Sequence, residues 1–372
     1  MNQIEQARRL GQSVWYDDMR RGLLVSGELK NLIDLGVSGL TSNPTIFEKA
    51  IAGSNDYDQA LTGPSLAGKD AREVYEDLTL YDIRAAADLL RPVFDRTGGE
   101  DGYASLEPNP DIAYDTAATI AEARRLFAAL NRPNVMIKVP ATSEGMPAVR
   151  QLISEGINVN ITLIFSLEAY RQAREAYICG LEHLARRGGG TVSKVASVAS
   201  FFVSRVDTAV DTLLEKRIRQ GHEELKPLLG KAAVANSRLA YQAFKNTFAS
   251  MRFSELENRG ARVQRVLWAS TSTKNPAYPD LLYVEPLIGR HTINTMPGAT
   301  LAAFLDHGRV SATLEQDMEG AERALQALDA AGISMEQVTA RLLADGVRSF
   351  SDSSHKLLAS VEEKRARLLP EG

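Results

Sequence analysis

Cysteine, long apolar runs and clustered positive charge are all scarce in this sequence. Cys179 is the one cysteine among 372 residues, and it cannot form a disulfide within the chain. No apolar run approaches the roughly 18–20 residues that cross a bilayer, and the first residues, MNQIEQARRL, lack the apolar core of a signal peptide. We therefore expect a soluble cytoplasmic protein without a membrane partner, either a monomer or a homodimer.

Patterns typical of nucleic-acid, metal and nucleotide binding are also missing. The formal net charge is -4, and no basic stripe is interleaved with aromatic residues, so nucleic acid is not an expected partner. The five histidines are scattered without a metal-ligand spacing such as HExxH. No Walker, GxGxxG or GxSxG pattern occurs. We expect no metal and no organic cofactor, and an anionic substrate would need a local cationic pocket.

What the sequence does contain is an alternation of short β-type runs with amphipathic helical patterns. Such alternation favours parallel βαβ units. The count predicts a single (β/α)₈ TIM barrel over residues 1–372, although an open doubly wound sheet has a similar signature. We expect a loop at 52–70, a helical insertion at 207–260 and further helices at 311–369. The predicted strands lie near 13–17, 35–41, 102–107, 134–139, 157–163, 192–199, 264–270 and 281–285.

The run INVNITLIF at 157–165 has two chemically different faces. Apolar residues alternate with Asn158, Asn160 and Thr162, as expected for a strand with one polar face. In a barrel that face would point inward, where buried amides and hydroxyls need partners. A bound polar ligand would supply them, but a solvent-facing side of an antiparallel strand explains the same pattern equally well.

Lys138 lies in the run PNVMIKVPAT at 133–142, on the strand face opposite Val135, Ile137 and Val139. It would therefore point into a barrel near the carboxyl end of its strand, where barrel active sites lie. A neutral lysine amine attacks a ketone to form a Schiff base, and burial disfavours the charged form of lysine. Taken alone, a lysine on a strand is more often an edge or surface residue.

Two carboxylates, Asp17 and Glu107, fall at the predicted carboxyl ends of other strands. Separated acids beside a neutral lysine could divide the roles of general acid and general base. The competing interpretation is that each acid caps the helix or turn that follows it. That interpretation weakens because several polar residues occupy corresponding places on different strands.

Several segments of the sequence resemble the signature blocks of the transaldolase family in its long bacterial form. The resemblance extends over nearly the whole chain, and the lysine block together with the NxNxT strand is its most specific part. It implies an α/β barrel with a Schiff-base lysine on the fourth strand. The blocks are GVSGLTSNPTIFEKAI (36–51), VMIKVPATSEGMPAV (135–149), INVNITLIFSLEAY (157–170), VASFFVSRVD (198–207) and the block at 268–297.

The resemblance also implies roles for individual residues. Lys138 resembles the Schiff-base lysine, Asp17 the aspartate that handles the C4-hydroxyl proton, and Glu107 with Thr162 the pair that moves protons through a held water. Substrate-binding residues implied in the same way are Asn43, Asn160, Ser200, Phe202 and Arg205, with Arg205 on the substrate phosphate.

Two local departures from the family pattern affect these roles. Shorter relatives carry a Ser-x-Arg pair after the seventh strand, whereas Ser270 is followed here by Thr271 and Ser272, with Lys274 as the next cation. We infer that Lys274 takes the place of the arginine. Glu107 lies in LEPNP rather than in the expected LEV run, so a proline follows it.

The implied activity is transfer of a dihydroxyacetone unit from fructose 6-phosphate or sedoheptulose 7-phosphate to erythrose 4-phosphate or glyceraldehyde 3-phosphate, in the pentose phosphate pathway. Two alternatives remain open at this point. One is a small-barrel aldolase that releases dihydroxyacetone to water, and the other is a non-catalytic sugar-phosphate binder. A lid role for 52–70 is a further hypothesis, based on its loop composition.

Overall fold

The computed structural model describes residues 1–63, 68–187 and 191–368. Its β-strands form one closed sheet in the order β1 to β8, and every neighbouring pair is parallel. The predicted fold class, a (β/α)₈ TIM barrel, is therefore confirmed. The strands are β1 (Gln12–Tyr16), β2 (Gly39–Thr41), β3 (Tyr103–Leu106), β4 (Val135–Pro140), β5 (Val159–Ile164), β6 (Ser197–Phe202), β7 (Arg265–Ala269) and β8 (Thr292–Met296).

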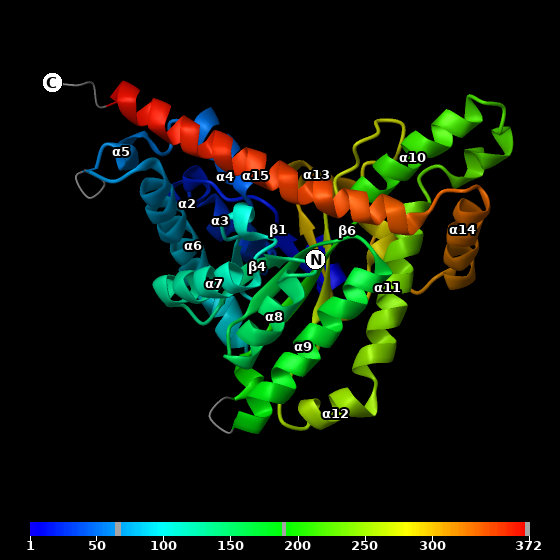
Figure 1. The fold of residues 1–372 in the computed structure, drawn as a ribbon, viewed down its shortest axis with the longest axis horizontal. Coiled ribbons are helices and arrows are strands. Elements are labelled where there is room, and N and C mark those ends of the chain that lie inside the picture. The colour runs from blue at the N-terminus through cyan, green and yellow to red at the C-terminus, as the bar shows by residue number, and fades with distance from the viewer. Residues whose placement is uncertain (64–67, 188–190, 369–372) are drawn as a thin grey trace.

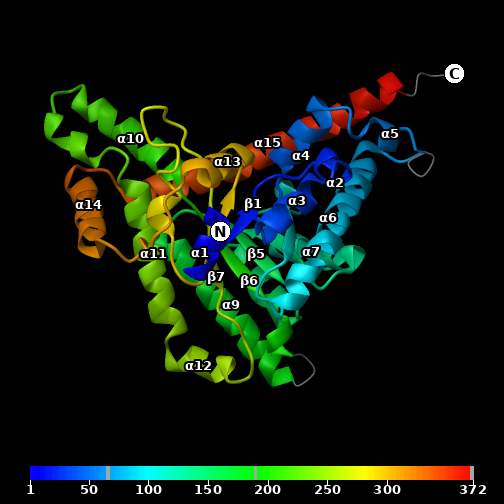
Figure 2. The same ribbon diagram turned by 180° about the vertical axis from the view of Figure 1, so that it is seen from behind.

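Helices surround this barrel on all sides (Figures 1 and 2). Every strand residue is buried, as expected for a parallel sheet covered by helices. The α-helices are α1 (Gln3–Arg9), α2 (Arg21–Val25), α3 (Glu28–Leu35), α4 (Pro44–Gly53), α5 (Asp58–Leu61), α6 (Ala71–Arg96), α7 (Thr116–Leu130), α8 (Gly145–Ser154), α9 (Leu167–Arg187), α10 (Ser204–Ile218), α11 (Ala232–Phe248), α12 (Met251–Glu257), α13 (Gly298–His307), α14 (Met318–Ala330) and α15 (Met335–Leu368). The 3₁₀ helices are η2 (Pro110–Ile112), η3 (Val192–Lys194), η4 (Glu223–Leu228) and η5 (Glu285–Leu287).

The prediction of the last strand is wrong, because the eighth strand is Thr292–Met296 and not 281–285. Residues 281–284 form turns that lead into η5. Leu281, Tyr283 and Val284 are buried all the same. Trp268 of β7 donates from Nε1 to the Leu287 carbonyl at 3.0 Å and helps to hold this segment against the barrel. An apolar run buried in a turn has the same composition as a short buried strand.

Further boundaries also differ from the prediction. The second strand begins at Gly39, because Leu35 is still part of α3. The sixth strand begins at Ser197, because residues 192–194 form the 3₁₀ helix η3 instead. The predicted loop at 52–70 contains the end of α4 and the short helix α5, while residues 64–67 lie outside the described residues. A lid role for this segment stays a prediction.

The expected extra helices are present in both regions. The segment 207–260 carries most of α10 together with η4, α11 and α12, and the segment 311–369 carries α14 and α15. Among the described residues, no helix is long and apolar enough to cross a membrane.

Helix α15 crosses one end of the barrel, above the carboxyl ends of the strands, from the side of α14 to the side of α5 (Figure 1). It packs along α4 and also contacts α6, α10 and β5. Gly346 allows the close crossing, because a Cβ there would lie 2.9 Å from a methyl carbon of Leu163 in β5. Leu163 itself has a φ of 57° at an irregularity in the pairing of β5 with β6, a backbone feature that occurs often near active sites.

Side chains of α15 tie it to short helices at the same end of the barrel. The hydroxyls of Ser353 and Thr45 lie 2.8 Å apart, and Ser351 donates to Asp111 at 2.5 Å. Farther along, Lys364 forms an ion pair with Asp58 at 2.9 Å. These contacts hold α15 against α4, α5 and η2, which follow β2 and β3.

Candidate active site

Lys138 projects into the barrel from the carboxyl half of β4, as the alternation of the strand predicts. Its side chain is 6% exposed, and its Nζ atom donates to the Ser42 carbonyl at 3.0 Å. Nζ also lies 3.1 Å from Oε2 of Glu107 and 6.0 Å from the ring centre of Phe350. The amine is thus held by one carbonyl and one carboxylate beneath an aromatic ring.

Glu107 directly follows β3 and is buried beside this amine, so the proline that follows it has not moved it out of the site. Apart from the contact with Lys138, neither carboxylate oxygen accepts a hydrogen bond from the described residues. Burial raises the pKa of Glu107, and the charge of Lys138 opposes that shift. The Thr162 hydroxyl is also buried without a hydrogen-bond partner among the described residues. Unpaired buried polar groups are costly, which is consistent with groups that act on a ligand.

A cavity of about 150 Å³ opens beside Lys138 and contains the second predicted carboxylate, Asp17. Thr41 donates to Asp17 from Oγ1 at 2.6 Å. Burial raises the pKa of Asp17, while the Thr41 hydrogen bond and the charge of Lys138 lower it. Asn43 also lines the cavity, and its Oδ1 caps helix α4 by accepting from the Ile46 amide at 3.0 Å. Asn43 therefore caps a helix and lines the cavity at the same time.

The other wall of the cavity is cationic. Arg205, at the start of α10, makes no hydrogen bond or ion pair with the described residues, and its guanidinium lies over the Phe202 ring at 5.4 Å. Burial lowers the pKa of Arg205, and the nearby charges of Asp17 and Glu107 oppose that shift. Lys274 lines the same wall and donates to the Ser272 hydroxyl at 2.6 Å. Burial, followed by repulsion from Arg205 and Lys49, lowers the pKa of Lys274.

Most of the predicted site residues therefore lie around one cavity. Ser270 lines it with a φ of 54°, and its hydroxyl lies 3.0 Å from that of Ser204. Those that line the cavity are Asp17, Asn43, Lys138, Thr162, Ser200, Phe202, Arg205, Ser270 and Lys274.

Two predicted residues stand behind the cavity rather than on its wall. Glu107 reaches it through Lys138. Asn160 is fully buried, accepts from the Ser200 hydroxyl at 2.6 Å and donates to the Ser105 hydroxyl at 3.2 Å. In this arrangement Asn160 orients Ser200 and does not itself face the cavity.

Sequence reasoning missed Phe350, Thr41, Ser272 and Thr295 as cavity residues. Thr41 and Ser272 stand two residues from Asn43 and Ser270, so their position at strand ends was a usable signal. Thr295 was missed because the eighth strand was placed at the wrong segment. Nothing in the sequence connects Phe350 with the barrel, because the crossing of α15 is a tertiary feature.

The fold and this cavity fit the class of barrel enzymes, whose active sites lie at the carboxyl ends of the strands. Comparison with known proteins places the chain within one family of that class. The family model described as Transaldolase/Fructose-6-phosphate aldolase matches residues 14–361, and the chain belongs to this family.

Curated relatives agree with this assignment over nearly their full length. A transaldolase of Trichodesmium erythraeum is 45% identical over 377 residues, covering 99% of both chains. One of Thermobifida fusca is 47% identical over 365 residues and 98% of both chains. One of Acidothermus cellulolyticus is 49% identical over 359 residues, covering 96% of this chain and 95% of the relative. The predicted family and enzyme class, that of the transaldolases, are therefore confirmed.

Proposed function

We propose that this protein transfers a dihydroxyacetone unit from fructose 6-phosphate or sedoheptulose 7-phosphate to erythrose 4-phosphate or glyceraldehyde 3-phosphate, through a Schiff base on Lys138. The observation that carries the proposal is the position of Lys138, which forms an ion pair with Glu107 on one side and borders a cavity with a cationic wall on the other. These substrates belong to the pentose phosphate pathway. A cytoplasmic location is part of the same proposal.

In the first half-reaction, the Lys138 amine adds to the C2 ketone of fructose 6-phosphate, and the ketone oxygen leaves as water. Glu107 and Thr162 supply and accept the protons of this step. Asp17 then removes the proton of the C4 hydroxyl, and the C3–C4 bond breaks. The bonding electrons pass into the iminium to give an enamine, and glyceraldehyde 3-phosphate leaves.

In the second half-reaction, the enamine carbon attacks the aldehyde of erythrose 4-phosphate, and Asp17 returns the proton to the new hydroxyl. Water then hydrolyses the iminium and releases sedoheptulose 7-phosphate from Lys138. Arg205, and beside it Lys274, would hold the phosphate of each sugar, because a guanidinium presents a fixed fork of donors to phosphate oxygens. No step of this scheme needs a metal or an organic cofactor.

The direct test is borohydride reduction in the presence of fructose 6-phosphate, followed by peptide mass spectrometry. We expect a reduced dihydroxyacetone adduct on Lys138. A Lys138→Arg enzyme should fold normally and lose essentially all transfer, because a guanidinium does not form the Schiff base. Substantial transfer by that variant would disprove the lysine assignment. A folded wild-type protein that binds sugar phosphates but forms no adduct would instead be a binder.

The family description also names an aldolase, and that activity differs only in the fate of the enamine. The ring of Phe350, on the crossing helix, lies 6.0 Å from Nζ of Lys138 and lines the same cavity. It would shield an enamine on Lys138 from water, which favours transfer. Incubation with fructose 6-phosphate alone distinguishes the two activities. Sustained release of free dihydroxyacetone without an acceptor would identify the aldolase.

A further inference from the structure

A cavity of about 460 Å³ lies outside the barrel, between α6, α7, α15 and the segment that follows β3. We call it the lateral cavity. Its walls include Tyr75, Glu107, Pro110, Ala118, Ala121 and Leu126. It opens to solvent between α6 and α7, where Ala121 and Arg125 are exposed. Nothing in the catalytic scheme above uses it.

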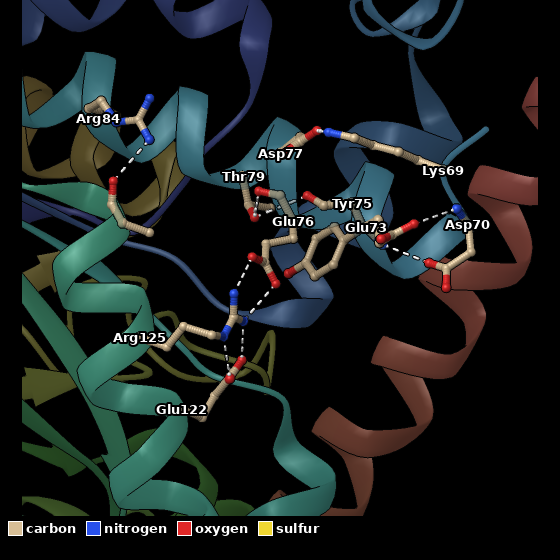
Figure 3. Close-up of polar contacts among 11 residues, drawn as sticks. Lys69, Asp70, Glu73, Tyr75, Glu76, Asp77, Thr79, Arg84, Glu122 and Arg125 are labelled. Atoms are coloured by element: carbon tan, nitrogen blue, oxygen red, sulfur yellow. Dashed lines mark hydrogen bonds and ion pairs between the residues drawn. The ribbon is translucent and has the colours of Figure 1, made fainter. Parts of the chain in front are cut away.

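Figure 3 shows how the rim of the lateral cavity is built. Arg125 of α7 bridges Glu76 of α6 and Glu122 of its own helix, with Nη2 at 2.7 Å and 2.8 Å from their carboxylates. This bridge ties α6 to α7 beside the opening. Tyr75 lies next to it, and its ring meets Phe47 edge-on at 6.0 Å. Tyr75 also lines the cavity.

The inner end of the lateral cavity reaches the catalytic lysine through Glu107. Glu107 forms part of its wall and also borders a small cavity of about 10 Å³, whose other wall includes Lys138. That volume is close to the room that one water molecule needs. Lys138 in turn lines the catalytic cavity. Glu107 and Lys138 therefore separate the solvent-open lateral cavity from the catalytic cavity.

The chemistry at this partition requires water. Each Schiff base that forms expels one water, and each that is hydrolysed consumes one. During these steps a sugar phosphate fills the catalytic cavity beneath α15, so the barrel mouth is a poor path for water. The Glu107 carboxylate is 2% exposed and unpaired apart from Lys138. Pro108 and Pro110 beside it have no amide hydrogen to donate.

We propose that the lateral cavity is a water site and a second entrance, through which water reaches Glu107 and Lys138 while sugar phosphate occupies the barrel mouth. This inference rests on the proposed function. The oxygen expelled from C2 of the ketose leaves as water on the side of Glu107, and the oxygen of an incoming water becomes the C2 oxygen on hydrolysis. Movement of the Glu107 side chain connects the small cavity with the lateral one.

The experiment follows the C2 oxygen of fructose 6-phosphate labelled with ¹⁸O, incubated with the full-length enzyme and no acceptor. The first measurement is the rate at which the sugar loses ¹⁸O, corrected for spontaneous exchange. The second is the rate at which borohydride traps the Lys138 adduct. The readout is the first rate divided by the second, which is the label lost per adduct formed. The variants Ala118→Phe and Ala121→Trp fill the lateral cavity, and Ala121 is exposed, so its replacement does not have to fit a packed core. The matched control is Ala128→Trp, an exposed position on the same helix α7 that does not line the cavity.

We expect both filled variants to trap adduct at nearly the wild-type rate but to lose label several-fold more slowly per adduct, with the control unchanged. Equal label loss per adduct in wild-type, control and both filled variants would overturn the inference while leaving the proposed function intact. A wild-type protein that forms no adduct would overturn the proposed function first, and this inference with it.

Discussion

At the scale of single residues, the catalytic cavity is defined by polar side chains with few partners. Arg205 is the clearest case, because the described residues offer it only the face of Phe202. A guanidinium that lines a cavity and has no carboxylate partner in the protein is suited to bind an anionic group of a substrate. Lys274 beside it adds a second positive charge with a lowered pKa.

Replacing Arg205 by Gln should therefore act on the phosphate and not on the chemistry. A hydrogen bond to a charged group contributes about 1.5–3 kcal/mol, so kcat/KM for fructose 6-phosphate should fall by about 10- to 100-fold. The much lower rate with unphosphorylated fructose should hardly change. Steady-state kinetics with both sugars provide the measurement, and Arg309→Gln, an exposed arginine outside the cavity, is the control. An equal loss with both sugars would contradict the phosphate role.

Thr41 offers a test of Asp17 as the base. Its hydrogen bond lowers the pKa of Asp17, against the effect of burial. In Thr41→Val the pKa of Asp17 should rise, so the acid limb of the kcat/KM profile should move to higher pH by about one unit. Thr295→Val is the control, because its hydroxyl contacts Thr41 at 2.7 Å and not Asp17. An unmoved acid limb in Thr41→Val would remove Asp17 from this role.

The sequence predicted those site residues whose side-chain direction follows from the alternation of a strand. Lys138, Thr162 and Asp17 lie where their strands predict, because neighbouring residues of a strand point to opposite faces. The partners of Asn160 were not predictable in this way. Whether its amide faces a ligand or Ser200 depends on the register between β5 and β6, which single strands do not encode.

At the scale of elements, α15 changes an open barrel mouth into a covered one. The helix carries Gly346 over Leu163 and, one turn later, Phe350 over Lys138. Further helices were predicted over 311–369, but the course of α15 was not, because contacts with distant segments such as α4 direct it. The misplaced eighth strand has a similar origin. The turn at 281–284 carries apolar residues because tertiary packing buries it, and this composition is also that of a short buried strand.

Phe350 should act as a positioning residue that keeps water from the enamine. In Phe350→Ala we expect more dihydroxyacetone to be released to water for each transfer to erythrose 4-phosphate, because water gains access to the site. Phe350→Leu keeps an apolar group of similar reach and should restore the wild-type ratio. Product analysis with and without acceptor gives this ratio, which a general loss of stability would not change. An unaltered ratio in Phe350→Ala would assign the shielding to other groups.

At the scale of the whole molecule, charge is distributed unevenly. The chain has a formal net charge of -4, yet Arg205 and Lys274 share the wall of one cavity. Composition predicted the need for such a pocket but not its place, since its cations come from segments about 70 residues apart. The charge of Asp17 favours the charged form of both cations, and the charge of Glu107 favours that of Arg205.

Helices from distant parts of the chain pack on one barrel, and we infer that residues 1–372 fold as one domain with a single unfolding transition. Asp207 of α10 links this helix to α11 and to the turn before η5. It is 1% exposed, accepts from the Ala233 amide at 2.7 Å and from the Tyr283 hydroxyl at 3.0 Å, and lies near Asp211. Burial raises the pKa of Asp207 to about 6.

This raised pKa makes stability depend on pH in a definite direction. An aspartate in the unfolded chain has a pKa of about 3.9, so between pH 4 and 6 the folded state binds the proton that the unfolded state has lost. The contribution of Asp207 is therefore fully present below about pH 4 and lost as pH rises through 6, by up to about 3 kcal/mol. Asp207→Asn cannot ionise and keeps one oxygen acceptor.

The difference in free energy of unfolding, wild type minus Asp207→Asn, should thus fall between pH 4 and 7 in urea titrations. Asp88→Asn is the control of opposite sign, because Arg132 lowers the pKa of Asp88, so its difference should rise over the lowest part of that range. A constant difference for Asp207→Asn would mean that this carboxylate ionises normally in the folded protein.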